Sequence, residues 1–392
     1  MKVRDCFELN PLKNKNTFKD FINYIDTSSV QNGTLINVSF LENEFPSRAQ
    51  RIVEYNDILY STVRPNLRHY YLYQDDFEHA VASTGFVLLR RKNNCNVKFI
   101  FYYLSTNEVV KHLSNIAEMS QSTFPSFSSK DLGKIDLPMI DEYKQKSIVD
   151  ILACYDSLIE NNNKRIKVLE QMAENLYKEW FVRFRFPGHE NAEFENGIPK
   201  GWEIKRLMNF GRIETGKTPS TEVIENYGND ILFVKTPDMH GNTYVVDSEE
   251  KLSLIGNNTQ PKKLLPPNSI MVTCIGSGGV VAINAVQAHT NQQINSIIID
   301  DMRYLEWLYY TCKSLKSTIE MFGATGTTMT NLSKGKFEKL KVIKPPIELI
   351  VSFHNIVEPL LSKIKSLIYQ NANLIKQRDL LLPRLMSGKL EV

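Results

Sequence analysis

SQSTFPSFSSKDLGKIDLP, residues 120–138, and TGTTMTNLSKGKFEKLKVIKP, residues 325–345, are two versions of one pattern. Each begins with a run rich in serine and threonine, continues with apolar residues at matching spacing, and ends in proline. The apolar positions correspond at a constant shift of 205 residues, which relates Phe127 to Leu332 and Leu132 to Phe337. An internal repeat at this distance indicates that the chain is built from two copies of one plan.

A long helical pattern follows the proline of each copy. Its apolar residues recur at steps alternating between three and four, which is the heptad pattern of a coiled coil. One short stripe is typical of a helix in a globular core, but two matched long stripes favour pairing of the two helices. Each seam contains one asparagine, a residue that lowers stability and can fix the register. The seam positions are Ile148, Leu152, Tyr155, Ile159, Asn162, Ile166, Leu169, Ala173, Leu176 and Trp180 in the first helix, and Phe353, Val357, Leu360, Ile364, Leu367, Asn371, Leu374, Arg378, Leu381 and Leu385 in the second.

The limits of the helices follow from length and from proline. The first is predicted over about residues 147–181, which is roughly 50 Å at the rise of an α-helix. Pro359 lies inside the second pattern, and proline removes a helical hydrogen bond and collides with the preceding turn. The second helix is therefore predicted to begin or to kink at Pro359.

The predicted fold class is mixed α/β, in the order module, helix, module, helix. A turn and a β-rich run at residues 56–62 parallel residues 268–274, and residues 83–89 roughly parallel residues 293–299. Residues 186–199 are rich in glycine, proline and asparagine and are interpreted as a linker. The predicted boundaries are 1–141 for the first module, 142–186 for the central helix, 187–345 for the second module with 187–199 as its linker, and 346–392 for the C-terminal helix.

Composition excludes several classes of protein. No apolar run reaches the length of a bilayer span, and the N-terminus has no signal-peptide core, so the cytoplasm is the expected location. The five cysteines are scattered without a CxxC pair, and the histidines form no pair at metal-ligand spacing, so we expect neither disulfides nor a metal site. The formal net charge of +3 does not by itself indicate nucleic acid.

Residues 211–218, GRIETGKT, match the phosphate-binding loop pattern, and residues 297–301 resemble the strand with a magnesium-binding acid that accompanies it. Such a loop follows a buried strand and opens a helix. Here residues 203–210 have helical spacing, Pro219 disfavours helix at Thr218, and Glu214 would repel phosphate. We interpret residues 211–220 as a turn held by Gly216 and Pro219. A nucleotide-dependent enzyme is kept as the alternative, as is a helical interaction scaffold without a DNA role.

Three short motifs, in this order of modules and helices, resemble the specificity subunit of type I restriction-modification systems. IPKGWE at residues 198–203 is similar to the start of that family's second target recognition domain, and TGKTPS at 215–220 to the turn that follows it. EWFV at 179–182 with FPG at 186–188 is similar to the end of the central helix. Met1 falls several residues inside the family's pattern, and no IPxGW motif precedes the first module.

The resemblance implies a non-catalytic subunit that recognises double-stranded DNA. Each of two target recognition domains would read one half of a bipartite target, and two long antiparallel coiled-coil helices would set the spacer. The implied partners are two modification (methyltransferase) subunits and the restriction or motor subunits, with no membrane. S-adenosylmethionine, ATP and Mg would be used by these partners, and no cofactor by this chain.

Each module has as many acidic as basic side chains, so DNA binding must depend on clustering, and side-chain chemistry indicates the candidate DNA-binding residues. Arginine and amide side chains read base edges, bare glycine backbone permits close approach, and hydroxyl groups contact phosphate. Surface charge and helix capping are the alternative explanations. The candidates are Arg48, Arg51, Arg64 and Arg68, Ser122 and Thr123 in the first module, and Lys217, Thr218, Ser277 of the Gly276–Gly279 loop, Thr327, Thr328 and Asn331 in the second.

Overall fold

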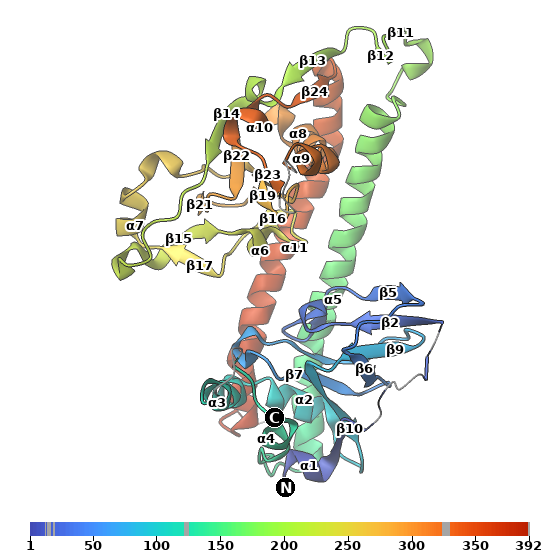
Figure 1. Ribbon diagram of the computed structural model, residues 1–392, viewed down its shortest axis with the longest axis vertical. Helices are drawn as coiled ribbons and strands as arrows, with labels where there is room; N and C mark the ends of the chain where they lie inside the picture. The colour runs from blue at the N-terminus through green and yellow to red at the C-terminus, as the bar shows by residue number, and fades with distance from the viewer. Residues whose placement is uncertain (12, 14–16, 19, 121–124, 324–329, 391–392) are drawn as a thin grey trace. The chain divides into compact units, whose positions relative to one another are not determined.

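The computed structural model describes the 392-residue chain except residues 12, 14–16, 19, 121–124, 324–329 and 391–392 (Figure 1). It divides into two compact units. Unit 1 comprises Met1–Leu158 together with Leu374–Val392, and unit 2 comprises Ile159–Asn373. The N-terminal and C-terminal segments of the chain therefore belong to the same unit.

The core of unit 1 is built on an antiparallel sheet with the strand order β1-β10-β7-β8. Helices α2 and α3 share its apolar cluster, in which Phe7, Tyr60, Phe99 and Leu113 are buried. A second sheet has the order β5-β2-β9-β6 and contains a parallel pair, β2 with β9. The bounds are α1 Val3–Cys6, β1 Phe7–Leu9, β2 Phe21–Ile25, β3 Val30–Gln31, β4 Thr34–Leu35, β5 Ser39–Glu42, β6 Ala49–Ile52, β7 Ile58–Ser61, β8 Tyr70–Leu72, β9 Ala80–Ser83, β10 Phe86–Arg91, α2 Val97–Leu104, α3 Asn107–Glu118 and α4 Ser129–Gly133.

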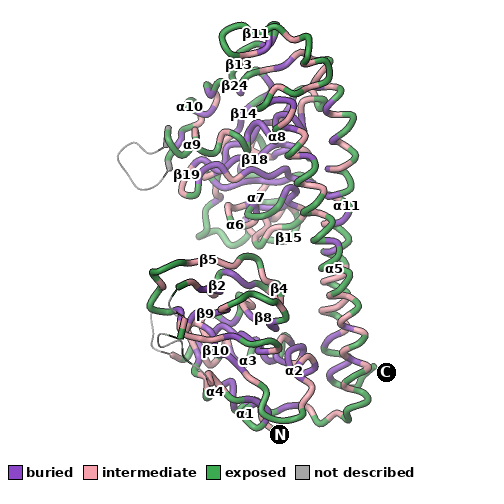
Figure 2. Tube along the Cα trace, turned by 90° about the vertical axis from the view of Figure 1, so that its right-hand side faces the viewer, coloured by how far each residue is buried: buried purple, intermediate pink, exposed green. Residues whose placement is uncertain are grey.

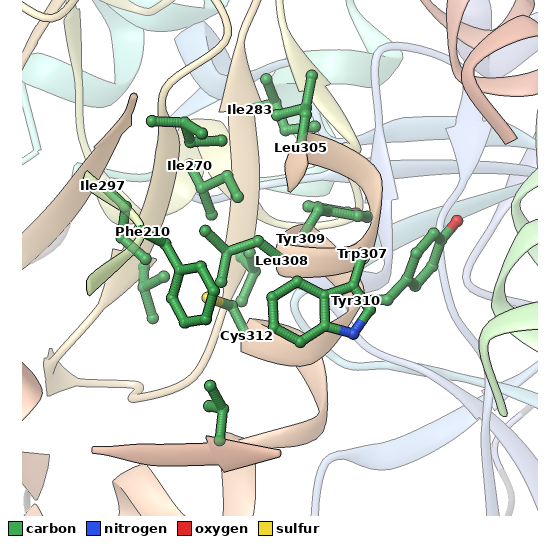
Figure 3. Close-up of a cluster of buried hydrophobic side chains, with 14 of the residues drawn as sticks. Phe210, Ile270, Ile283, Ile297, Leu305, Trp307, Leu308, Tyr309, Tyr310 and Cys312 are labelled. Carbon is green, nitrogen blue, oxygen red and sulfur yellow. The ribbon is translucent and has the colours of Figure 1, made fainter. Parts of the chain in front are cut away.

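Unit 2 repeats this plan with the order β14-β22-β18-β20-β16 and a second sheet β17-β15-β21. Figure 3 shows Phe210, Ile270 and Ile297 facing Trp307, Leu308 and other residues of α8 in the core of unit 2. The bounds are β13 Glu203–Arg206, β14 Gly211–Thr215, β15 Tyr227–Val234, α6 Thr236–Met239, β16 Tyr244–Val245, β17 Glu250–Leu252, α7 Leu254–Asn258, β18 Ile270–Thr273, β19 Ile275–Gly276, β20 Val281–Asn284, β21 Ala288–Thr290, β22 Ile294–Ile299, α8 Leu305–Ser314, α9 Lys316–Gly323, β23 Thr330–Asn331, α10 Lys334–Glu338 and β24 Lys341–Lys344.

Strands β1, β10, β7 and β8 of unit 1 correspond in order to β14, β22, β18 and β20 of unit 2, which confirms the internal repeat, and β16 is an additional strand in the sheet of unit 2. Leu59 lies opposite Leu88 in unit 1, and Met271 lies opposite Ser296 in unit 2. β7 and β18 correspond at a shift of 212 residues, which matches Leu59 with Met271. Their strand partners, Leu88 and Ser296, must then match as well, so β10 and β22 correspond at a shift of 208 residues. The sequence alignment of residues 83–89 with 293–299 was therefore two residues out of register, and the structural counterpart is 291–297.

The long helices are α5, Glu142–Tyr177, with one further π-helical turn over Lys178–Val182, and α11, Ile347–Met386. Every predicted seam position is buried or partly buried, and Figure 2 shows buried and exposed residues alternating along both helices. In unit 2, Phe181 packs on Phe353 with ring centroids 5.0 Å apart, and Asn162 Nδ2 donates to Asn371 Oδ1 at 2.9 Å. Residue numbers rise along one helix as they fall along the other, so the predicted antiparallel pairing is confirmed.

In unit 1 the ends of the two helices pack together with the first module. Arg378 Nη1 lies 2.7 Å from Asp156 Oδ1, and Tyr102 of α2 donates to Asp156 Oδ2 at 2.5 Å. Leu382 and Leu385 are buried in the same apolar cluster as Ile148. Leu382 and Leu385 of α11 thus complete the core of unit 1.

Three features of local structure differ from the prediction. α11 does not begin at Pro359 but runs through it from its first residue at Ile347, because seam packing on both sides offsets the one lost hydrogen bond. Residues 203–206 form strand β13, paired with β24, instead of a helix. Residues 211–215 form strand β14, paired with β22, instead of a turn.

The predicted linker contains a short hairpin. Strands β11, Phe194–Glu195, and β12, Ile198–Pro199, pair antiparallel around Asn196 and Gly197. Both turn residues have positive φ, 51° and 81°, as a two-residue hairpin turn of type I′ requires.

Candidate nucleic-acid interface

Three loops of unit 1 meet at one end of the strands of its main sheet: the loop after β7, the β9–β10 turn and the segment before α4. We call this surface, and its counterpart in unit 2, the loop edge. The loop after β7 contacts the segment before α4, where Phe127 N–H donates to Thr62 O at 3.1 Å. Arg64 N–H donates to Pro125 O at 3.0 Å, which fixes the same two segments one step further along. Thr62 N–H donates to Gly85 O at 2.9 Å, so the β9–β10 turn joins them. The arginine loop and the hydroxyl-rich segment, which are far apart in sequence, therefore meet.

Arg64 and Arg68 flank the short 3-10 helix Pro65–Leu67, and both have left-handed backbone, with φ of 48° and 56°. The Arg68 guanidinium turns inward and donates to Asn107 Oδ1, and to Tyr70 OH and Ser105 O at 3.5 Å each. Arg64 is exposed. Arg68 therefore anchors the loop to the turn before α3, whereas Arg64 presents its side chain at the surface.

Arg48 and Arg51 differ in the same way. Arg48 is exposed, and its carbonyl accepts a hydrogen bond from Thr84 N–H at 2.8 Å, which places it beside the β9–β10 turn. Arg51 lies in β6, and its Nε is enclosed without a partner among the described residues. Burial lowers the pKa of the Arg51 guanidinium. Arg48 thus belongs to the loop edge, and Arg51 lies largely within the module.

The corresponding edge of unit 2 has the same construction. β19 pairs with β23, and Leu332 N–H donates to Cys274 O at 2.9 Å, the counterpart of the bond from Phe127 to Thr62. Ser277 and Asn331 are both exposed at this edge. The repeat thus extends from the strands to the pairing of the loops.

Gly276 and Gly279, at the two ends of the glycine-rich loop that begins at the end of β19, differ in what surrounds them. A Cβ on Gly279, whose φ is 81°, would lie 2.8 Å from Lys316 Cα, so packing against α9 requires glycine there. At Gly276, with φ of 79°, a Cβ would meet only Gln293 Nε2, at 3.9 Å. The bare backbone is therefore accessible at Gly276 and enclosed at Gly279.

The GKT segment cannot cradle a phosphate with its backbone. Gly216 N–H donates to Ile294 O at 3.1 Å and Lys217 N–H donates to Thr290 O at 2.9 Å, so both donors are already used. A Cβ on Gly216 would lie 2.2 Å from Asn291 O. Thr218 Oγ1 donates to Gln292 Oε1 at 2.7 Å, and no helix begins after it. What the segment presents to solvent is the exposed side chain of Lys217.

Sequence reasoning missed Asn291, Gln292 and Gln293. These residues form the β21–β22 turn at the loop edge of unit 2, where Cys274 N–H donates to Gln293 O. Gln292 is exposed, Gln293 is half-buried, and Asn291 is buried. The available signal was a run of three amides directly before a β-rich run. Amide side chains are readers of base edges, so this run was a candidate on chemistry alone.

Four predicted contact residues, Ser122, Thr123, Thr327 and Thr328, lie outside the described residues. Among the residues that the structure describes, no group of histidine, cysteine and acidic side chains could hold a metal ion. Within the same residues, no helix is both long and apolar enough to cross a membrane.

Comparison with known proteins gives a consistent result. The family model described as type I restriction modification DNA specificity domain matches residues 1–171 and 199–373. A Haemophilus influenzae protein named type I restriction enzyme HindI specificity subunit is 32% identical, over 95% of this chain and 96% of its own length. The MjaIX specificity subunit of Methanocaldococcus jannaschii is 28% identical, over 79% of this chain and 73% of its own.

A crystal structure of a type I restriction-modification S subunit from M. genitalium shares the fold, with a TM-score of 0.53 at 14% identity, covering 98% of this chain and 95% of that one. The family model covers most of the chain, in two segments that each contain one module. This chain belongs to the type I restriction modification DNA specificity domain family.

Proposed function

We propose that the chain is the DNA sequence-recognition subunit of a type I restriction-modification complex, in which each module reads one half of a bipartite target. The observation that carries the proposal is the repeated loop edge. In both units a strand-end loop is hydrogen-bonded to the hydroxyl-rich segment that precedes the long helix. A duplicated binding edge suits two half-sites better than it suits one catalytic centre.

The division of labour follows the predicted boundaries. Residues 1–141 and 187–345 are the target recognition domains, and residues 142–186 and 346–392 are the helical segments. The paired helices set the spacer between half-sites and dock two methyltransferase subunits. Their continuous heptad seam supports this role, because a coiled coil holds its register over many turns.

Catalysis belongs to the partners. The methyltransferase subunits would use S-adenosylmethionine and the restriction subunits ATP and Mg, in the cytoplasm, while this chain binds none of these cofactors. The occupied backbone donors of Gly216 and Lys217 support this assignment, because they remove the nucleotide site that the sequence pattern offered.

The DNA contacts are assigned by exposure at the loop edges. We assign direct contacts to the exposed residues Arg48 and Arg64 in the first module, and to Lys217, Ser277 and Asn331 in the second. Arg68 and Thr218, whose side chains are hydrogen-bonded within their units, are positioning residues. Ser122, Thr123, Thr327 and Thr328 stay candidates by sequence, and Arg51 is the weakest, since its Nε is enclosed.

Mapping of methylated bases by long-read sequencing tests the function. A strain with this gene should modify a split sequence that the same strain without the gene leaves unmodified. In a complex carrying Arg64→Ala, methylation should weaken through the first half-site alone. Arg91→Ala, an exposed arginine at the opposite end of β10, is the matched control and should change nothing. An unsplit target, or equal effects of the two variants, contradicts the proposal.

A further inference from the structure

Gln293 lies in the β21–β22 turn of unit 2, in a closed set of hydrogen bonds. Its backbone N–H donates to Asn291 Oδ1 at 3.2 Å. In return, Asn291 Nδ2 donates to Gln293 Oε1 at 3.0 Å. Thr236 Oγ1, at the start of α6, donates to the same Oε1 at 3.3 Å.

This set fixes which end of the Gln293 amide faces outward. A backbone N–H can only donate, so the Asn291 atom that it meets must be the oxygen. Asn291 then presents its NH₂ to Gln293, and the Gln293 atom that accepts must also be the oxygen. With Asn291 and Thr236 both donating to it, Oε1 has its two acceptor positions filled. The Gln293 NH₂ group is left to point away from these partners.

The Gln293 NH₂ group faces the loop edge. Nε2 lies 3.9 Å from the position that a Cβ on Gly276 would take, and within the described part of the chain no acceptor is bonded to it. The backbone is held in place, because Cys274 N–H donates to Gln293 O at 2.7 Å. Asn291 is only 9% exposed, which keeps the supporting amide in one orientation.

We propose, resting on the proposed function, that Gln293 is a specificity-determining residue that reads guanine in the second half-site. Guanine presents two acceptors, O6 and N7, in the major groove, and a donor-only amide is complementary to them. Adenine presents a donor and an acceptor, and a glutamine reads it only when its own oxygen is available. Here that oxygen is occupied, so the amide discriminates against adenine.

The first module lacks this reader. At the same place in the turn, Gly85 N–H donates to Ser83 Oγ at 3.2 Å, which matches the bond from Gln293 to Asn291. A Cβ on Gly85 would lie 2.7 Å from Thr27 Cγ2, and Thr27 corresponds to Thr236 by the register of the parallel strands. The effect of changing Gln293 is therefore confined to one half-site.

The test is methylation mapping with the complete complex. Gln293→Ala should reduce discrimination for guanine at one position of the second half-site by about 10- to 100-fold and leave the first half-site unchanged. Asn291→Asp replaces the NH₂ that donates to Oε1 by an acceptor, so the Gln293 amide can turn its oxygen outward and the preference at that position should shift from guanine toward adenine. Gln287→Ala, at an exposed glutamine beside the other end of β21, is the matched control and should leave this position unchanged.

The outcomes separate the two levels of the proposal. If the wild-type complex modifies no split site, the proposed function fails. If it modifies a split site and Gln293→Ala keeps the wild-type profile, the assignment of Gln293 fails alone. A second half-site without guanine in the wild-type target also overturns it. Tryptophan fluorescence in urea confirms that each variant folds, since all three tryptophans lie in unit 2.

Discussion

Replacing the two asparagines of the helical seam, Asn162 and Asn371, should have strongly coupled effects on the free energy of unfolding. Asn162 and Asn371 are 7% and 8% exposed, and Asn371 also donates to Asn163 Oδ1 at 2.7 Å. In Asn162→Leu, Asn371 Oδ1 keeps its buried position and loses its donor. An unpaired buried polar group costs about 1–3 kcal/mol, so unit 2 should lose that much stability. Asn371→Leu leaves the Asn162 amide unpaired and should cost a similar amount.

The double variant should be close to wild type. Replacing both partners by leucine removes the need for the hydrogen bond and adds apolar burial in the seam, so the net change should stay within about 1 kcal/mol. The two single costs would then fail to add by about 1 kcal/mol or more, which is the signature of direct coupling.

Urea unfolding followed by tryptophan fluorescence measures these values for unit 2, because Trp180, Trp202 and Trp307 all belong to it. Asn161→Leu, on the exposed face of α5, is the control and should change stability by less than about 0.5 kcal/mol. Additive single costs, or single costs no larger than that of Asn161→Leu, would refute the reasoning.

Three further predictions use the same or related measurements. Gly216→Ala should destabilise unit 2 by about 1–3 kcal/mol through its contact with Asn291, whereas Gly335→Ala, in α10 with open space around it, should be neutral or stabilising. Burial lowers the pKa of His289 from 6.5 to about 4, so the unfolded chain binds a proton at this imidazole more readily than folded unit 2 does. The stability of unit 2 is therefore unaffected by this group above pH 6.5 and falls as the pH drops from 6.5 toward 4. Between pH 7 and 5, unit 2 should lose about 2 kcal/mol that a His289→Gln variant does not lose, measured by urea unfolding at each pH. Deleting one heptad from α5 and one from α11 should change the spacer of the methylated site and leave both half-sites as they were; an unchanged spacer would contradict the role of the helices.

Periodicity predicted the features that depend on local sequence. The seam of α5 and α11 followed from apolar spacing alone, and the asparagines in it pair with each other in unit 2. The repeated loops followed from matching residues 120–138 with 325–345, and the structure joins each to the equivalent strand-end loop. These signals were strong because two copies carried them independently.

The errors arose where a distant partner decides the local structure. Ile204 and Leu207 fit a helical spacing, but residues 203–206 gain their hydrogen bonds from a strand more than a hundred residues later. Glu214 would disfavour a buried strand if it were alone, and it is accepted because Lys263 pairs with it. The role of Arg68 likewise depends on Asn107, which the sequence around Arg68 does not contain.

The donor-only character of Gln293 had no sequence signal at all. It depends on a hydrogen bond from Thr236, fifty-seven residues earlier, and on the direction of one backbone N–H. Residue type indicated that a glutamine could read DNA, while the surrounding atoms determine which base it prefers.

The return of the chain to unit 1 has a consequence for synthesis on the ribosome. Residues 374–392 belong to unit 1, and Leu382 and Leu385 fill its core beside Ile148. Unit 2 is continuous in sequence, so it is complete as soon as residue 373 has emerged. Between Leu158 and Leu385, translation at about 5–20 residues per second takes on the order of 10–50 s. Throughout that time the first module keeps an apolar surface open, so the part of the protein made first is the last to finish folding.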